Sequence, residues 1–343
     1  MMKLIDLKNI KFPTKKDEEF RKIDLSLLYG YEFKEKKDHV LDFDVLNNDA
    51  LSSNNELYKI NQNLDAKSYE LNIVQNTDEP IVIIHKLNDD AVLNTSTLNI
   101  KVAKEVQASV IEVFVSNCQN SFYSVNRTFE VEQSANLNYF KYQDIKESNS
   151  LIINTIIDLK DKATIEHSNF ELGDGVNVNI YETALNSEES NLNINGLVRL
   201  YNETKSSSIF NTYHNNKSSF SNINFKHSLH DHSRAVFEAK SIVNDGANFS
   251  KVLQNSNTIL LSDDAVIFAK PHLEIHIDEL EASHGATVGS LNQEQLLYLR
   301  ARGISDAKAY EMLLSAFENE IYENIKDDKI KEFITNFKRS DYV

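Results

Sequence analysis

A short pattern recurs six times in the middle of this chain, at an almost constant interval. Each copy consists of a small residue, a polar residue and an apolar residue: Ala108-Ser109-Val110, Ala135-Asn136-Leu137, Ala163-Thr164-Ile165, Ser190-Asn191-Leu192, Ser218-Ser219-Phe220 and Ala247-Asn248-Phe249. The successive copies begin 27, 28, 27, 28 and 29 residues apart. Such a period is typical of a solenoid, in which each unit buries its apolar face by stacking on its neighbours.

Apolar and polar residues alternate with a period of two from about residue 68 to about residue 277, and each repeat holds about two strands. The sequence therefore predicts a mainly β protein with a β-helix core over 71–285, flanked by an amino-terminal helical or irregular region (1–70) and a carboxy-terminal helical domain (286–343). We expect the third residues of the six copies to form one inward stack. Because the chain has only 8 glycines, we expect asparagine at the left-handed corner positions.

The open ends of a β-helix expose unpaired strand edges, which invite association with another chain. We expect the amino-terminal segment and the carboxy-terminal helices to cap these ends, or a second subunit to pair with the last coil.

The end of the repeat region predicts a change from strand to helix. Leu273, Ile275 and Ile277 alternate with polar residues as in a strand, and Ser283-His284-Gly285 is predicted to form a turn. Asn292 is a candidate amino-terminal cap for a helix that ends at Gly303. Ser305 is predicted to begin a second helix, with one apolar stripe that includes Tyr310 and Phe317.

Composition excludes several classes of function. The 343 residues carry 36 basic and 52 acidic side chains, a formal charge of −16, which argues against nucleic-acid binding. No run approaches the roughly 20 apolar residues that span a bilayer, and we expect a cytoplasmic protein without a membrane role. The single cysteine, Cys118, excludes an internal disulfide. Nucleotide-binding glycine motifs are missing, so any ATP hydrolysis must come from another protein.

Histidines are the main candidates for chemistry. His284 lies in the predicted turn, where it is either a hydrogen-bonded structural residue or a metal ligand. His227, His230 and His232 could suggest a metal site, but no carboxylate or cysteine spacing completes one, and we interpret them as a polar corner of a coil. His272 and His276 are expected on a solvated strand face. Two other features have ordinary interpretations: Cys118 as a small buried side chain and Asp263-Asp264 as a turn.

Several of these motifs together resemble the SufB/SufD family of iron–sulfur cluster assembly scaffold proteins, and within it the SufD members. They are Lys270-Pro271, Leu273-Glu274-Ile275, the run from Ser283 to Gly289, Leu297-Tyr298-Leu299, Arg302-Gly303-Ile304 and the segment from Phe12 to Leu28, in which Phe20 stands where the family often has an indole.

The resemblance implies a non-catalytic scaffold subunit. It implies pairing with a SufB-like chain, or with a second copy, through the β-helix, and binding of a SufC-like ABC ATPase through residues 290–325. It also implies that His284 faces the interface where a transient iron–sulfur cluster forms, as a candidate iron ligand. Ala282 stands where the family often has a cysteine, which removes a thiolate from that position. No cofactor is expected to be held tightly by this chain alone, and a flavin contact is left open.

Two alternatives remain at this point. Many β-helices are polysaccharide lyases or hydrolases that use clustered carboxylates on a groove. A SufB-like paralogue is the other alternative, although such chains usually carry more cysteines.

Overall fold

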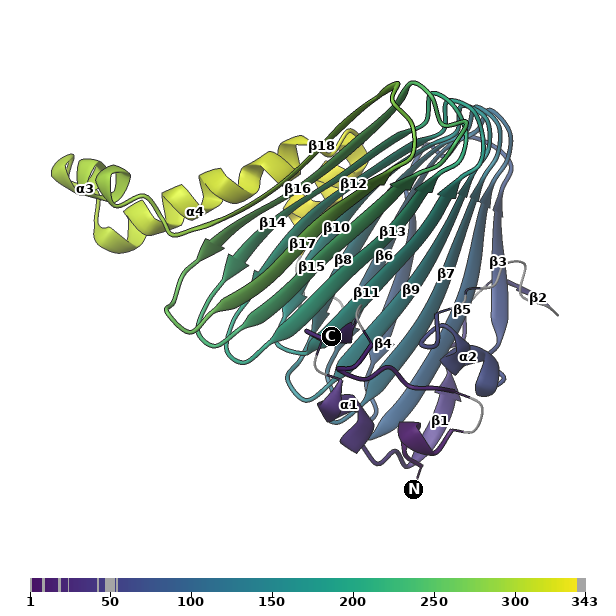
Figure 1. The fold of residues 1–343 in the computed structure, drawn as a ribbon. Coiled ribbons are helices and arrows are strands. Elements are labelled where there is room, and N and C mark those ends of the chain that lie inside the picture. The colour runs from purple at the N-terminus through teal and green to yellow at the C-terminus, as the bar shows by residue number, and fades with distance from the viewer. Residues whose placement is uncertain are drawn as a thin grey trace.

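The computed structural model of the chain describes residues 2–7, 10–17, 20–23, 25–41, 43–46, 53 and 55–337. Within these residues the chain forms a parallel β-solenoid of about 8 turns, with a few small helices towards the termini (Figure 1). This architecture confirms the predicted mainly β fold with a β-helix core.

The coils of the solenoid are built from two parallel sheets that receive alternate strands of the chain. The ten-stranded sheet contains β1 (Glu35–Asp38), β2 (Asp44–Leu46), β3 (Ser68–Ile73), β5 (Val92–Val102), β7 (Phe122–Val131), β9 (Ser150–Leu159), β11 (Val176–Leu185), β13 (Lys205–His214), β15 (Arg234–Val243) and β17 (Val266–Ile275). The eight-stranded sheet contains β4 (Ile81–Leu87), β6 (Gln107–Ser116), β8 (Asn136–Ile145), β10 (Thr164–Gly173), β12 (Asn191–Leu200), β14 (Phe220–Leu229), β16 (Ser250–Leu260) and β18 (Leu280–Gly289). Only β2 pairs in the antiparallel direction, with β3, among these strands.

The register between coils confirms half of the predicted inward stack. Leu137, Ile165 and Leu192 are lateral neighbours in the eight-stranded sheet and are fully buried. The neighbours that continue this row are Ala108 before it, and Ser221 and Val252 after it. Val110 is buried one inward position further along its strand, beside Tyr139, so its assignment to the stack was wrong.

Phe220 and Phe249 also lie outside the inward stack, in contrast to the prediction. Phe220 is half-buried beside Asn191, and Phe249 is 68% exposed. Phe249 occupies a corner with φ of 62°, equivalent to Ser134 (58°) and Lys162 (60°) in earlier coils. The small, polar, apolar pattern misassigned the last copies because insertions in these corners shift the strands.

The left-handed corners explain how the repeat tolerates unequal spacing. In most of these corners the left-handed residue donates its backbone N–H to a carbonyl in the corner of the next coil, as from Ser134 to Asp161 (3.0 Å) and from Phe249 to Glu279 (2.7 Å). The expected preference for asparagine is wrong, because only Asn120 and Asn202 have positive φ among the asparagines that the structure describes. The rigid hydrogen bonding around the corner therefore stabilises a conformation that most side chains resist.

The transition from sheet to helix differs from the prediction in two respects, one of which is that β17 ends at Ile275 and leaves Ile277 outside the strand. Ser283-His284-Gly285 is not a turn, because it lies in the middle of β18, paired with Leu253, Gln254 and Asn255. The turn precedes this strand, at residues 276–279. The predicted helix caps are confirmed: Asn292 accepts from the amides of Glu294 and Gln295, and Ser305 accepts from Lys308.

The terminal segments pack on the outer faces of the two sheets. The amino-terminal segment contains η1 (Leu4–Asp6), α1 (Ser26–Gly30) and α2 (Lys59–Asn63), and its buried Leu4, Phe20 and Leu28 pack against the ten-stranded sheet. The carboxy-terminal helices are α3 (Gln293–Ala301), α4 (Asp306–Glu323) and α5 (Asp328–Asn336). Ile321 and Ile330 of α4 and α5 pack against the eight-stranded sheet.

The two segments therefore cover faces, and the prediction that they cap the ends is not correct at the far end of the solenoid. There β17 and β18 each have a neighbour on one side only, in the part of the chain that the structure describes.

These burial differences predict contrasting effects of two truncations on stability. Leu192→Ala should lower the free energy of unfolding by about 2–5 kcal/mol, because it empties a buried site. Phe249→Ala should change it by less than about 0.5 kcal/mol, since most of the ring is already in water. Urea denaturation of both variants measures the difference. Equal losses of unfolding free energy in the two variants would contradict the strand register between the coils.

Candidate functional site

The far end of the solenoid, formed by β17 and β18, is the candidate site and is called the open end below. Both strands are at the edge of their sheets, so one row of backbone N–H and C=O groups on each has no strand partner in the described residues. Apolar side chains are exposed there as well, with Ile275 at 42% and Val288 at 54%. This end combines unpaired strands with exposed apolar surface, which is the composition of a protein interface.

His284 lies in the strand that closes this end. It pairs laterally with Gln254 of β16, whose side chain reaches across the interior of the solenoid to Ser241 of β15. Because in-register parallel strands place equivalent residues on the same face, His284 stands on the inner face, exposed at the last coil. Ala282 and Ala286 flank it two residues away on this face and supply no ligand atoms. His284 is thus an accessible imidazole at the mouth of the solenoid.

The two neighbouring histidines do not join His284. His272 lies on β17 and alternates with inward residues such as Leu273, so it stands on the outer face and is exposed. His276 follows β17, where its Nε2 is 3.2 Å from Glu274 Oε1 on the surface. Both positions confirm the expected solvated surface.

The three histidines between residues 227 and 232 occupy different environments. His230 stacks on Tyr201 with ring centroids 4.3 Å apart, and the exposed His232 has Nδ1 3.5 Å from Asp264 Oδ2. These two lie at a coil corner, as predicted. His227 was misassigned, because it points into the solenoid, where it is 1% exposed.

The inward position of His227 has an electrostatic consequence. Neither ring nitrogen has a hydrogen-bond partner among the described residues. Burial lowers the pKa of His227 to about 3, so the ring is neutral in the folded protein.

The remaining sequence candidates have structural roles. Cys118 is buried with Sγ 3.7 Å from Asn149 Oδ1, and burial raises its pKa, which keeps the thiol protonated. Asp263 and Asp264 lie in the turn after β16, as predicted. Among the residues with described positions, no group of three or more histidine, cysteine, aspartate and glutamate side chains could hold a metal ion. A metal at the open end would therefore need further ligands from outside this chain.

A buried polar cluster inside the first coils was not anticipated from the sequence. Glu112 Oε1 lies 2.6 Å from His85 Nε2 and 2.7 Å from Arg127 Nε, and Tyr123 OH lies 2.8 Å from His85 Nδ1. Burial alone would raise the pKa of Glu112, but the Arg127 guanidinium and His85 hold it well below its usual range. The alternation of strand residues puts all of these side chains on inward positions. This alternation was the sequence signal from which a buried polar cluster could have been predicted.

The second buried cluster, one coil further along, contains a charged lysine. Lys141 Nζ lies 2.5 Å from Asn179 Oδ1 and 3.2 Å from Tyr181 OH, and burial lowers its pKa to about 8. Both clusters are enclosed by the two sheets, so they can organise the interior but cannot meet a large substrate.

The helical arm, defined as α3 and α4, follows β18: α3 projects away from the solenoid, and α4 runs back to the outside of the eight-stranded sheet (Figure 1). The second half of α4 is attached to the sheet: Glu318 pairs with Arg199 and accepts from Ser228 Oγ at 2.8 Å, and Lys226 Nζ donates to the Phe317 carbonyl at 2.6 Å. The first part of the arm is exposed, with Leu297 at 65%, Tyr298 at 60% and Met312 at 42%.

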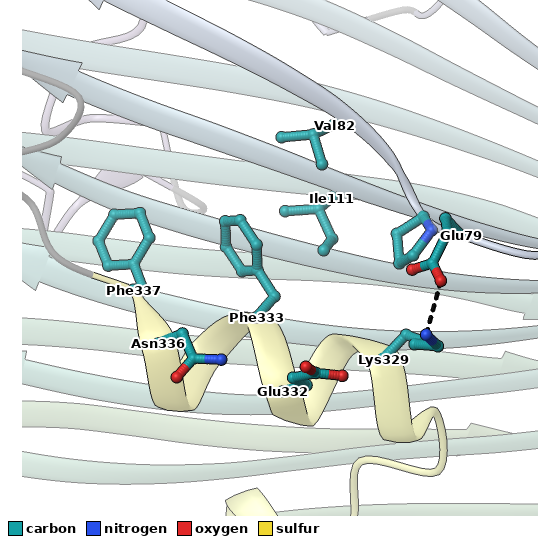
Figure 2. A pocket seen from close by; sticks show the side chains of 9 residues that line it. Glu79, Val82, Ile111, Lys329, Glu332, Phe333, Asn336 and Phe337 are labelled. Atoms are coloured by element: carbon teal, nitrogen blue, oxygen red, sulfur yellow. Dashed lines mark hydrogen bonds and ion pairs between the residues drawn. The ribbon is translucent and has the colours of Figure 1, made fainter.

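Two hollows lie beside these helices. A hollow of about 620 Å³ separates the corner after β16 from the arm, with Leu260, Val288 and Tyr310 in its wall. Figure 2 shows the other, of about 450 Å³, between α5 and β4, where Phe333 points toward Ile111 and Lys329 Nζ lies 2.6 Å from Glu79 Oε1. Ser262 and Asp263 also line the first hollow, and Glu332 also lines the second; both hollows lie at the edge of the helical tail.

Fold and site together define a class of protein: a parallel β-solenoid with an open, interface-like end and a partly detached helical arm. Comparison with known families assigns it further. Residues 85–317 match the model for "SUF system FeS cluster assembly, SufBD core domain", and the chain belongs to this family. Membership agrees with a scaffold role in iron–sulfur cluster assembly and not with the polysaccharide-cleaving alternative.

Individual relatives agree with this assignment. The iron–sulfur cluster assembly protein SufD of Escherichia coli (strain K12) is 31% identical over 267 residues, which are 75% of this chain and 62% of that protein. SufD of Plasmodium falciparum (isolate 3D7) is 27% identical over 223 residues, 56% of this chain and 15% of the relative. A SufBD family protein of Synechocystis is 37% identical over 95 residues, 28% of this chain and 21% of the relative. The names favour a SufD-like chain, which spans less than two thirds of these relatives.

No helix in the part of the chain that the structure describes is both long and apolar enough to cross a membrane.

The buried neutral state of His227 predicts how stability depends on pH. Below pH 6.5 the unfolded chain binds a proton at this residue and the folded chain does not until about pH 3, so stability is lost as pH falls through this window. His227→Gln should therefore reduce the slope of unfolding free energy against pH, by up to about 1.4 kcal/mol per pH unit. Chemical denaturation between pH 6.5 and 4 measures the slope. The exposed His232→Gln is the matched control, and an equal slope in wild type and His227→Gln would refute the prediction.

Proposed function

We propose that this chain is a non-catalytic scaffold subunit of an iron–sulfur cluster assembly complex. The observation that carries the proposal is the open end of a SufBD-family solenoid, where unpaired strand edges, exposed apolar side chains and His284 occur together. The two polar clusters inside the early coils are enclosed by the two sheets, which supports a role for them in holding the fold and not in catalysis on a large substrate. The protein acts by holding partners and cargo in place.

The first partner is a homologous, SufB-like subunit, or a second copy of this chain, at the open end. An incoming strand that pairs with β17 or β18 would satisfy the free backbone groups of these edges. It would also cover Ile275 and Val288, whose burial favours association by the hydrophobic effect. A solenoid of the same construction fits best, because its coils have the same sheet spacing.

The second partner is a SufC-like ABC ATPase, bound through residues 290–325. Support comes from the contrast within the helical arm: the second half of α4 is attached to the sheet, whereas Leu297 and Tyr298 of α3 face solvent. Exposed aromatic and aliphatic side chains on a short helix are typical anchors for a groove in another protein. Such binding would provide the ATP hydrolysis for which this chain has no motif.

The cargo is iron, delivered to the interface between the paired solenoids. His284 supplies an imidazole, which is a suitable iron ligand when neutral. Ala282 provides no thiolate, so the sulfur atoms and the remaining ligands come from the substrate and the partner subunit. The chain alone therefore holds no cluster tightly, and the cluster is transient and shared.

Two pairs of surface variants test the division of partners. Leu297→Asp with Tyr298→Asp should abolish ATPase capture and leave subunit pairing intact, because a charge replaces the apolar anchor. Ile275→Asp with Val288→Asp should have the reverse effect. Co-purification of the three proteins, with melting temperature as the folding check, measures both. Loss of both partners in either variant at an unchanged melting temperature would refute the division.

Point variants are preferable to deletion of the helical tail. The second half of α4, with α5, covers Ile111, Phe140 and Phe170 on the outer face of the sheet. Its removal would expose this apolar surface and confuse loss of binding with loss of solubility.

A second experiment tests the role of His284 in holding iron. His284→Ala should leave the complex assembled but lower the iron and sulfide recovered per complex, because one ligand is lost while the exposed position contributes little to packing. His276→Ala removes a nearby exposed histidine and is the matched control. Iron and sulfide are assayed together with melting temperature. Unchanged iron in a fully assembled His284→Ala complex would make His284 an ordinary surface residue.

A further inference from the structure

The coil beneath His284 contains polar side chains that have no partner for part of their hydrogen-bonding capacity. Gln254, Ser256 and Thr258 alternate along the inner face of β16, and each is at most 3% exposed. Gln254 Oε1, Ser256 Oγ and Thr258 Oγ1 have no hydrogen-bond partner among the described residues. Buried polar atoms without partners are costly, so a row of three requires a reason.

The amide of Gln254 is held in one orientation by its nitrogen. Nε2 donates to Ser241 Oγ at 2.7 Å and to the His272 carbonyl at 3.3 Å, both in the opposite sheet. These two acceptors occupy the two N–H groups of the amide, and the His272 carbonyl has no hydrogen to donate to the amide oxygen. Oε1 is therefore the free end of the amide, an acceptor fixed inside the last coils.

The lateral neighbour of Gln254 in the final coil is His284. Neighbouring strands are about 4.8 Å apart, so an imidazole and an amide at paired inward positions are within reach of a hydrogen bond. Histidines that bind metals almost always donate their other ring N–H to a carbonyl or carboxylate oxygen, which sets the tautomer and the direction of the ring. The open end contains such an acceptor directly beneath its one inward histidine.

We propose that Gln254 is the positioning residue for His284. The two side chains are not hydrogen bonded in the structure. When the exposed imidazole turns inward, Gln254 Oε1 accepts one ring N–H, which leaves the other ring nitrogen without a proton and directed out of the mouth toward a ferrous ion. Ser256 and Thr258 continue the polar floor on the same face. The inference rests on the proposed function only for the identity of the cargo. The hydrogen bond between Gln254 and His284 can be tested independently of that function.

Two measurements on the full chain test the pair. The nitrogen chemical shifts of His284, recorded at pH 8 with labelled histidine, report which ring nitrogen carries the proton. Wild type should show one dominant tautomer and Gln254→Leu a mixture. Anaerobic titration with ferrous iron should show an affinity lower by about tenfold or more in Gln254→Leu, the usual effect of losing such a partner. Gln254→Glu should retain or increase the affinity, because a carboxylate is a stronger acceptor.

The controls separate this inference from the proposed function. Asn255→Ala changes the next residue of β16, on the outer face, and should behave as wild type in both measurements. One outcome would overturn the role of Gln254 and retain that of His284. In that outcome Gln254→Leu has the wild-type tautomer and iron affinity, whereas His284→Ala loses iron. Iron binding by His284→Ala equal to wild type would instead overturn the iron role of His284, while the tautomer measurement would still decide whether Gln254 positions the ring.

Discussion

Lateral pairing of each strand with the equivalent strand of the next coil is the interaction on which the structure depends. It satisfies the backbone groups of every interior strand, and it aligns side chains into rows that run the length of the solenoid. Rows of apolar residues, such as Leu137, Ile165 and Leu192, supply the core. The same rows determine the environment of the last strand. An inward side chain on β18 has a neighbour in β16 on one side and no neighbour in the described residues on the other, and His284 is such a side chain.

The rows also explain why charged residues are tolerated inside. Glu112 and Arg127 enter the interior from strands of opposite sheets and form a buried ion pair, and His85, whose pKa is lowered mainly by burial, lies within hydrogen-bond distance of the Glu112 carboxylate. Breaking one member of such a group is usually far more harmful than replacing the whole group, because it leaves an uncompensated charge in a medium of low polarity. The cluster therefore makes the early coils depend on a small set of mutually compensating side chains.

Sequence reasoning predicted the architecture because the repeat and the alternation of apolar residues are properties of single strands. It failed where the outcome depends on how two coils align. Phe249 fits the repeated pattern by spacing, yet the corner before β16 is longer than the corners before β8, β10, β12 and β14, and the Phe249 ring lies in solvent. Ser283-His284-Gly285 has the composition of a turn, but pairing with β16 keeps it extended. Similarly, the sequence indicated His284 as a site residue, whereas Gln254 became visible only through the register between the last two coils.

The attachment of α4 gives the solenoid a defined length scale. Arg199 and Ser228, which bind Glu318, belong to β12 and β14, and the mouth is formed by β18 in the same sheet. The attachment point of α4 and the mouth are therefore separated by a fixed number of strands, each adding about 4.8 Å. A coil inserted between β14 and β18 would move His284 away from this attachment point by one such step, while α3 would still follow β18 directly. The number of repeats thus sets the distance between the place where α4 is fixed and the mouth, independently of the chemistry at either place.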